Sequence, residues 1–297
     1  MRLSSPATAF AVATVGIACF SAMDAVMKAL TIAIGAYNAM FWRMLVGVAI
    51  GGTAYFALRS PWPTRAAMRV HLTRGILTSG MGLLFFWGLA RVPLAQGVAL
   101  AFIAPLIALY LAAVILKERI ERQAILGSVL GFVGVLVILS AQARGDMGPE
   151  ALEGAIAILV SALLYAWNII LMRQQAQIAR PVEVAFFSGL IVACIYLLAA
   201  PFLAELPPSN QLPSILASAV LGFASLILLA WAYARAEAQY LAPVEYSAFI
   251  WAVLFGIVIF AEPVRPLTVV GAAMIVAGCI IAARRRDGPV TDAISGV

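Results

Sequence analysis

A segment in the first half of the chain recurs in the second half at a fixed offset of 144 residues, without any gap. Each copy consists of two apolar runs joined by a short charged turn, so one structural unit occurs twice. Such a repeat restricts the chain to a fold built from two similar halves. The matched positions are Trp87 with Trp231, Ala90 with Ala234, Arg91 with Arg235, Glu118 with Glu262, Gly127 with Gly271, and Gly134 with Gly278.

The apolar runs are long enough to decide the class of protein. Hydrophobic residues make up 64% of the chain and charged residues only 11%, which excludes a water-soluble domain of 297 residues. A transmembrane helix needs about 20 apolar residues, and only closed hydrogen-bonded structures are stable in lipid. The runs are too long, and alternate too little, for barrel strands. The sequence therefore predicts an all-α integral membrane protein.

Charged, proline-rich and glycine-rich breaks divide the chain into ten predicted transmembrane helices. The first five form a repeat over residues 7–142, the next five form a second repeat over 151–283, and 284–297 form a tail. Because five is an odd number, the second repeat enters the membrane from the opposite side. We therefore predict two inverted repeats around a central cavity. The ten helices cover residues 7–30, 36–58, 70–90, 94–116, 123–142, 151–173, 182–204, 213–234, 239–261 and 265–283.

The distribution of basic residues predicts the orientation in the membrane. Of the 19 lysine and arginine residues, fourteen fall on the side of the two termini and three on the other side. Cytoplasmic loops carry the excess of basic residues in membrane proteins. We therefore expect both termini, including the tail, to be cytoplasmic.

The two halves carry a shared junction motif. Glu118 is followed nine residues later by Gly127, and Glu262 nine residues later by Gly271. This arrangement of ten helices resembles the drug/metabolite transporter superfamily of the EamA type, and most of all its bacterial aromatic amino acid exporters. The resemblance implies a multi-pass protein of the bacterial inner membrane that exports aromatic and other neutral amino acids, or similar small metabolites, by alternating access. One departure is that Glu262 is followed by proline and Glu118 by arginine, so the two junctions need not behave alike.

Other functional classes lack their sequence features. There is no GxxxxGK[ST] motif, so ATP does not drive transport in this chain. His71 is the only histidine and is expected in a cytoplasmic loop, which leaves no set of metal ligands. We therefore expect no cofactor, no metal and no nucleic-acid partner, but a small-molecule substrate, membrane lipid, and a monomer or homodimer. Alternatives are a drug or other metabolite exporter of the same fold, a membrane-embedded enzyme, or a channel.

Two charged residues in the first helix are the first candidates for the site. Asp24 and Lys28 lie one turn apart on one face, within ion-pairing reach. Charged residues inside a membrane pair with one another or line water. The pair could bind the charged ends of a zwitterion or a proton; alternatively, Lys28 extends to the outer interface. The offset pairs Asp24 with Asn168, another polar residue in mid-helix.

Further candidates lie on other helices. Arg43 could bind a carboxylate through its guanidinium, or pair with Asp24. Glu245 is either a cavity carboxylate or an interfacial one. Pro105 removes a backbone hydrogen bond and is predicted to bend its helix and act as a hinge. Aromatic residues offer flat surfaces for a substrate side chain, although most aromatic residues in membrane helices pack or mark interfaces. The predicted substrate-binding residues are Asp24, Lys28, Trp42, Arg43, Phe102, Tyr165, Asn168, Glu245, Tyr246 and Trp251.

Small residues recur in the last helix of each half. Gly127, Gly131 and Gly134 lie in the first half, and Gly271 and Gly278 in the second. Glycine faces let membrane helices approach closely. We interpret these glycines as packing surfaces.

Overall fold

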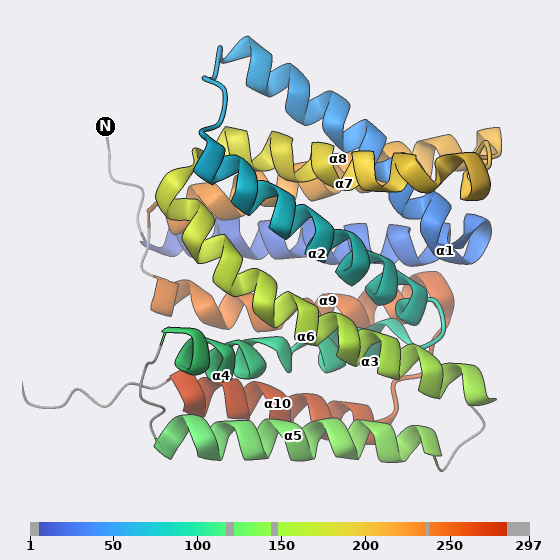
Figure 1. The fold of residues 1–297 in the computed structure, drawn as a ribbon. Helices are drawn as coiled ribbons and strands as arrows, with labels where there is room; N and C mark the ends of the chain where they lie inside the picture. The colour runs from blue at the N-terminus through green and yellow to red at the C-terminus, as the bar shows by residue number, and fades with distance from the viewer. Residues whose placement is uncertain (1–5, 117–121, 144–147, 236–237, 284–297) are drawn as a thin grey trace, which may run out of the picture.

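A computed structural model describes residues 6–116, 122–143, 148–235 and 238–283. The described residues form helices joined by short loops, and no β-strand occurs among them (Figure 1). This confirms the prediction of an all-α fold for the described part of the chain. The Glu118 junction lies outside the described residues.

The helices follow the predicted apolar runs, with differences at their ends. Thr64 caps the second helix, since its hydroxyl accepts a hydrogen bond from the Ala67 amide at 3.2 Å. That helix therefore begins at Arg65, and His71 lies within it rather than in a loop as predicted. In chain order the elements are α1 (Pro6–Ala57), α2 (Arg65–Leu89), α3 (Leu94–Ala101), α4 (Ala104–Leu116), α5 (Arg122–Ala143), α6 (Gly148–Ile178), α7 (Pro181–Leu203), the 3-10 turn η1 (Ser209–Gln211), α8 (Leu212–Tyr233), α9 (Ala238–Phe260) and α10 (Pro266–Ala283).

Helix α1 contains the first two predicted helices, which meet at one residue. Gly35 has φ 79° and ψ 155°, and the chain on either side of it is helical. Glycine adopts a positive φ without a steric penalty, so the chain reverses there (Figure 1). The predicted turn over 31–35 thus shrinks to one non-helical residue.

The predicted helix over 94–116 is interrupted in the middle. Residues 102 and 103 separate α3 from α4, and the amides of Phe102 and Ile103 bond to carbonyls three residues back. Pro105 is the second residue of α4, and its ring nitrogen cannot donate to the carbonyl of Ala101. The predicted bend before Pro105 is confirmed; its role as a hinge remains a prediction.

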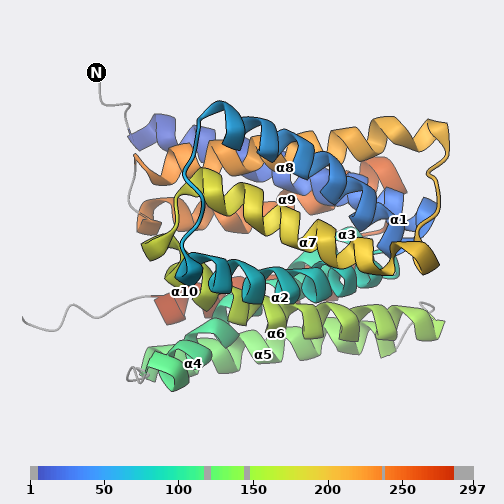
Figure 2. The same cartoon turned by 45° about the horizontal axis from the view of Figure 1, so that its top comes forward.

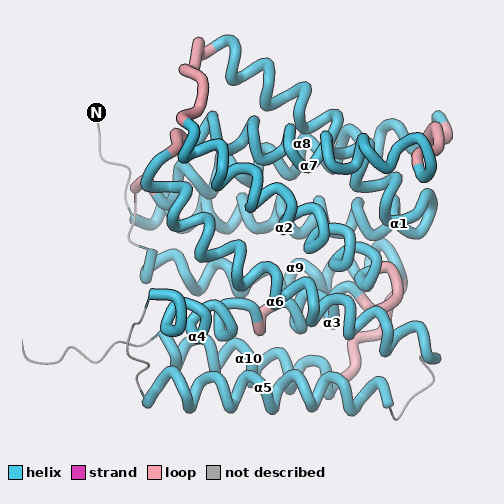
Figure 3. Tube along the Cα trace, in the orientation of Figure 1, coloured by secondary structure: helices cyan, strands magenta, loops and turns pink. Residues whose placement is uncertain are grey.

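Loops gather at the two ends of the bundle, apart from the break between α3 and α4 (Figure 3). We name these ends by residues: the Pro6 end, where α1 begins and α10 finishes, and the Gly35 end, where α1 reverses (Figure 1). Helices α7 and α8 lie on one side of the bundle and α4 and α5 on the other, in both orientations (Figures 1 and 2).

Helices α5 and α10 pack through glycines, as predicted. A Cβ added at Gly134 would lie 2.7 Å from the Gly271 carbonyl oxygen, and one added at Gly271 would lie 2.6 Å from that of Gly134. A Cβ added at Gly278 would overlap the Gly127 carbonyl oxygen in the same way. The two backbones therefore touch directly, with no room for a side chain between them.

This contact gives a first prediction. Gly134→Ala should destabilise the protein by about 1–3 kcal/mol, because the new methyl group overlaps backbone that cannot rotate away. Gly47→Ala on α1 is the matched control: a Cβ there meets nothing within 4 Å, so stability should not fall. Thermal unfolding of both variants in detergent measures the difference. Equal melting temperatures would contradict the packing argument.

The outer surface of the bundle is apolar. Phe202 is 88% exposed, Leu198 79% and Val114 77%, values expected of side chains that contact lipid. Shorter apolar helices occur at 94–108, 125–140, 244–260 and 266–281. Together these features describe a multi-pass membrane protein. Within the described residues, five helices are long and apolar enough to cross a membrane, namely Ala7–Ala57, Arg65–Leu89, Glu150–Met172, Val182–Leu203 and Ser209–Tyr233.

Candidate functional site

A buried ion pair joins the two halves of the sequence at the Gly35 end. Lys28 on α1 pairs with Glu262, which lies in the loop between α9 and α10. The Lys28 ammonium also donates to the Val92 carbonyl oxygen at 2.6 Å, and it lies 5.0 Å from the centre of the Phe260 ring. The second oxygen of Glu262 accepts a hydrogen bond from the Leu94 amide at 2.7 Å. We call this group the Lys28–Glu262 bridge.

The local backbone explains why Glu262 reaches into the bundle. Ala261 has a φ of 51°, a left-handed conformation that is uncommon outside glycine and that turns the chain back at the end of α9. Gly256 leaves room for the carboxylate, since a Cβ there would lie 3.1 Å from the Glu262 Oε2 atom. Leu94 is the first residue of α3, so its N–H, which the carboxylate accepts, is one of the N–H groups without an intrahelical partner at a helix start.

The predicted pairing of Lys28 with Asp24 is wrong. Lys28 is 2% exposed and directs its ammonium toward the Gly35 end, where Glu262 supplies the carboxylate. A lysine side chain is long enough to reach a partner beyond its own helix, whereas aspartate is short. Asp24 consequently lacks Lys28 as a partner and lies close enough to Arg43 for their charges to interact.

Asp24 and Arg43 form the core of a second polar group, between α1 and α8. Asp24 is 5% exposed, and its Oδ1 atom has no hydrogen-bond partner within the described part of the protein. The same holds for Arg43 Nε and for the hydroxyl of Ser225 on α8. A Cβ added at Gly222, one turn from Ser225, would lie 2.9 Å from Arg43 Nη2, so glycine makes room for the guanidinium. An acceptor and a donor of opposite charge are thus buried close together without a direct hydrogen bond.

A third polar group, between α2, α6 and α7, was missed by the sequence analysis except for Asn168. Arg74 donates from Nε to Asn168 Oδ1 at 3.0 Å and from Nη1 to Gln175 Oε1. The Gln175 side chain also contacts His71 Nδ1 at 2.6 Å, and His71 Nε2 lies 3.0 Å from Glu183 Oε1. The available signal was spacing: His71 and Arg74 lie three residues apart on α2, and Asn168 and Gln175 seven apart on α6, so each pair shares a helix face.

Tyr165 and Glu245 are connected to this group through Arg74. Tyr165 on α6 is 41% exposed and interacts electrostatically with Glu245 on α9 and with Arg74 on α2. Glu245 is exposed and accepts a hydrogen bond from the Tyr233 hydroxyl at 2.5 Å. Two of the predicted residues, Tyr165 and Glu245, are therefore brought together, and Arg74 links them to Asn168.

The remaining predicted residues occupy other places. Trp42 donates from its indole to the Glu205 carbonyl oxygen at 2.9 Å, so it fastens the loop after α7. Phe102 and Tyr246 contact each other edge to face, with ring centres 5.7 Å apart. This contact packs the α3–α4 break against α9, and Cys279 donates to the Phe102 carbonyl oxygen at 3.5 Å.

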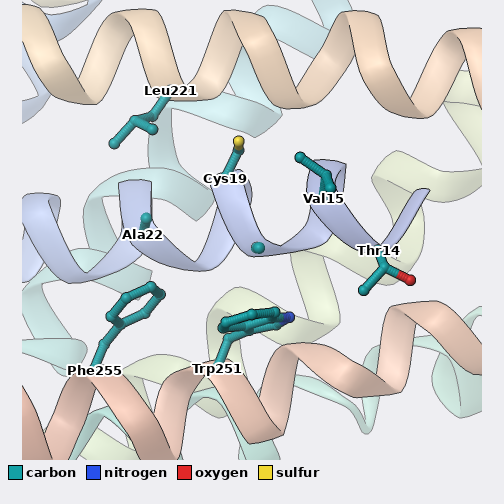
Figure 4. Close-up of a pocket in the computed structure, with 8 residues that line it drawn as sticks. Thr14, Val15, Cys19, Ala22, Leu221, Trp251 and Phe255 are labelled. Carbon is teal, nitrogen blue, oxygen red and sulfur yellow. The ribbon is translucent and has the colours of Figure 1, made fainter. Parts of the chain in front are cut away.

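Trp251 lines an apolar cavity of about 310 Å³ between α1, α8 and α9 (Figure 4). Its ring stacks on Phe255, and Cys19 and Leu221 complete the wall shown in the close-up. Ala22 on α1 also lines this cavity. Side chains two positions apart on a helix are rotated by about 200° around the helix axis, so Ala22 and Asp24 face nearly opposite directions. Trp251 therefore does not join the Asp24–Arg43 group.

Comparison with known proteins assigns these features to a family. A model of the EamA-like transporter family matches residues 8–140 and 152–284, two stretches that begin 144 residues apart, as the repeat does. The chain belongs to the EamA-like transporter family. Membership confirms the resemblance at the level of the EamA family and the drug/metabolite transporter superfamily.

Several curated transporters are similar over much of the chain. The pseudopaline exporter CntI of Pseudomonas aeruginosa (strain UCBPP-PA14) is 24% identical over 91% of this chain and 93% of its own. An S-adenosylmethionine uptake transporter of Rickettsia conorii is 26% identical over 86% of this chain and 85% of its own. An uncharacterized transporter of Helicobacter pylori (strain J99) is 26% identical, and the chain spans 62% of that protein's length.

A crystal structure of a protein aligns with a TM-score of 0.63 and 21% identity, and covers 94% of this chain and 98% of that chain. The likeness concerns the fold. The transporter role for a small-molecule substrate is supported by the EamA-like family and by the curated transporters.

Proposed function

We propose that the protein is a secondary transporter with ten membrane spans in two inverted five-helix repeats, and that it exports amino acids, aromatic and other neutral ones, by alternating access. The observation that carries the proposal is the Asp24–Arg43 group. Asp24 Oδ1 can accept from the ammonium of an amino acid, and Arg43 Nε can donate to its carboxylate. Both atoms are buried and have no other hydrogen-bond partner among the described residues.

The contacts between helices support the inverted repeat. The offset relates α1 to α6 and α8 to α2, and α1 packs on α8 as α6 packs on α2. The first half of α1 starts at the Pro6 end, whereas α6 starts at the Gly35 end (Figure 1). The contact between Phe102 and Tyr246 also joins two offset-related positions, as expected of residues beside a two-fold axis between the halves.

The repeated Trp–Arg motif has the same geometry in both halves. The Arg91 guanidinium lies 3.6 Å from the centre of the Trp87 ring, and that of Arg235 lies 4.1 Å from the Trp231 ring. Each arginine also donates to the carbonyl oxygen of its tryptophan. The motif ends α2 at the Gly35 end and α8 at the Pro6 end, which supports opposite insertion of the two copies.

Alternating access needs one end closed while the other admits substrate. The Lys28–Glu262 bridge ties the two repeats together at the Gly35 end. Tyr165 and Glu245, both in the second repeat, interact electrostatically and remain exposed. The tie at the Gly35 end supports a conformation open toward the Pro6 end, with Pro105 beside the helix break as the proposed hinge.

Direction and substrate class rest on the relatives and on the basic residues. One relative is named for export of pseudopaline and another for uptake of S-adenosylmethionine, which contains a methionine unit. A substrate with an α-amino acid end fits the Asp24–Arg43 group. The excess of basic residues supports a cytoplasmic Pro6 end, so substrate would enter there and leave at the Gly35 end.

Counterflow in proteoliposomes tests the proposal. Vesicles loaded with unlabelled phenylalanine should accumulate labelled phenylalanine transiently, and unlabelled neutral amino acids outside should compete with it. An impermeant thiol reagent that labels Ser209→Cys but not Ser60→Cys, in a background without native cysteines, gives the orientation in the same vesicles. Counterflow of S-adenosylmethionine with no response to any amino acid would contradict the proposed substrate class.

A further inference from the structure

The hydrogen bonds between α2, α6 and α7 form one continuous chain. It runs from Glu183 through His71 and Gln175 to Arg74 and Asn168. His71 is fully buried, Gln175 is 1% exposed, and Glu183 is 6% exposed. These hydrogen-bonded side chains have no part in the proposed substrate group, because Asp24 and Arg43 lie on α1.

The donors and acceptors along this series of hydrogen bonds fix the protonation state of His71. Arginine only donates hydrogen bonds, so the Gln175 atom that faces Arg74 must be the oxygen. The Gln175 NH2 group then faces His71 Nδ1 and donates to it. His71 Nδ1 must therefore carry no proton, and the proton of the neutral ring is on Nε2, where it donates to Glu183.

A second proton on His71 is incompatible with this arrangement. Once Nδ1 carries a proton, Nδ1–H and the Gln175 NH2 group face each other as two donors. Rotation of the Gln175 amide restores an acceptor for His71, but it turns the NH2 group toward the Arg74 guanidinium, again donor to donor. Arg74 then loses its bond to Gln175 and keeps only Asn168 among these partners.

The surroundings of His71 can hold the added charge. The titratable and charged groups around it are Glu183 on α7, which accepts from Nε2, Tyr55 on α1, which interacts electrostatically with Glu183, and Arg74 on its own helix. Helix α6 contributes the neutral Gln175. Phe187 stacks on the imidazole with ring centres 5.6 Å apart and holds its plane. Glu183 thus neutralises the imidazolium, while its contact with Nε2 stays unchanged.

Arg74, once free of Gln175, has an alternative on its other side. It already interacts electrostatically with Tyr165, which interacts with Glu245. We propose that His71 is a proton-binding site, and that its second proton releases Arg74 from Gln175 toward the Tyr165–Glu245 side of the bundle. This rests on the proposed transport function in naming the coupling ion as the proton, with Arg74 as the group that the proton makes available on that side.

The single histidine of the chain makes the test direct. In untagged protein labelled with 15N-histidine, every imidazole signal comes from His71, and protonated and unprotonated ring nitrogens resonate far apart. At high pH we expect an unprotonated Nδ1 and a protonated Nε2. On acidification both nitrogens should become protonated in one step. The opposite neutral tautomer at high pH, or an imidazole that stays neutral down to pH ~5, would overturn the proposal.

Gln175→Glu tests the link to Arg74. A carboxylate accepts from both Arg74 and protonated His71, so proton affinity at His71 should rise about tenfold or more. Gln174→Glu is the matched control, because it adds the same charge one residue away at an exposed position and should leave the His71 spectrum unchanged. An equal shift in both variants would show a general charge effect and overturn the proposed relay.

Transport assays then separate the two proposals. In the wild type, counterflow should strengthen on acidification, by at most about tenfold per pH unit for one proton. Gln175→Glu should flatten this response, because Arg74 stays held at every pH. Absence of amino acid counterflow with an intact His71 titration would count against the substrate, not the proton site. A wild-type pH response that Gln175→Glu leaves unchanged would count against the release of Arg74.

Discussion

Lys28→Met should destabilise the protein by about 3 kcal/mol, the largest loss that we expect from one substitution. The change leaves the Glu262 carboxylate without its cation and with the Leu94 amide as a remaining hydrogen-bond donor. We place the effect at the lower end for a broken buried pair, because the Glu262 side chain keeps 18% exposure and can be partly solvated. Methionine is the natural replacement, since the offset pairs Lys28 with Met172.

A second substitution identifies the cause. Adding Glu262→Gln to Lys28→Met removes the unpaired charge and keeps an oxygen to accept from the Leu94 amide. The double variant should recover most of the lost stability, as for a buried pair replaced on both sides. Thermal unfolding in detergent gives both values. A double variant as unstable as the single one would mean that the lysine side chain, rather than the ion pair, carries the stability.

The same variants test whether the Lys28–Glu262 bridge keeps the Gly35 end closed. If the bridge holds the Gly35 end closed, then Lys28→Met should speed alkylation of a cysteine placed at Thr31, which is 6% exposed in this conformation. Unchanged alkylation together with reduced stability would make the bridge a structural contact only.

Asp24→Asn should lower transport by about tenfold to a hundredfold, the value of one hydrogen bond between charged groups, about 1.5–3 kcal/mol. Asparagine keeps the shape of the side chain but removes the charge that would bind an ammonium. Counterflow of phenylalanine in proteoliposomes measures the loss, with unfolding temperature as the check on folding. Glu153→Gln, at an exposed position on α6, is the control for a carboxylate-to-amide change and should transport normally.

A second substitution, at Arg43, distinguishes substrate binding by Asp24 from simple charge neutralisation. If Asp24 only neutralises Arg43, then Arg43→Gln added to Asp24→Asn should restore transport, because neither charge remains. We expect the double variant to regain stability but not transport, since both ends of the substrate lose their partners. Recovery of transport in the double variant would discard the binding role and leave a structural pair.

The apolar runs and the repeat predicted much of this fold from the sequence. A run of about 20 apolar residues has one stable form in lipid, so the helices followed almost directly. The glycine contacts between α5 and α10 followed as well, since a small face on each helix has few other uses in a membrane. The break beside Pro105 followed from the missing N–H group.

The pairing of charged side chains could not be predicted in the same way. Lys28 and Glu262 are 234 positions apart, and the contact depends on the turn at Ala261 and on the space at Gly256. Neighbouring residues on one helix offered Asp24 as the simpler partner. His71 was assigned to a loop because the N-cap at Thr64 was not recognised, so the chain from Glu183 to Asn168 went unseen.

The two halves of the molecule are not equivalent at the position of Lys28. Its counterpart, Met172, accepts a weak hydrogen bond from Asn168 at 3.6 Å and carries no charge. A symmetric transporter would hold its two end states at equal free energy, with the substrate as the only bias. In the proposed alternating-access mechanism, one end state gains the Lys28–Glu262 ion pair, and Met172 cannot form a matching pair in the other. Each 1.4 kcal/mol of that difference shifts the resting population about tenfold. The empty carrier should therefore wait on one side of the membrane, ready to load where its substrate is supplied.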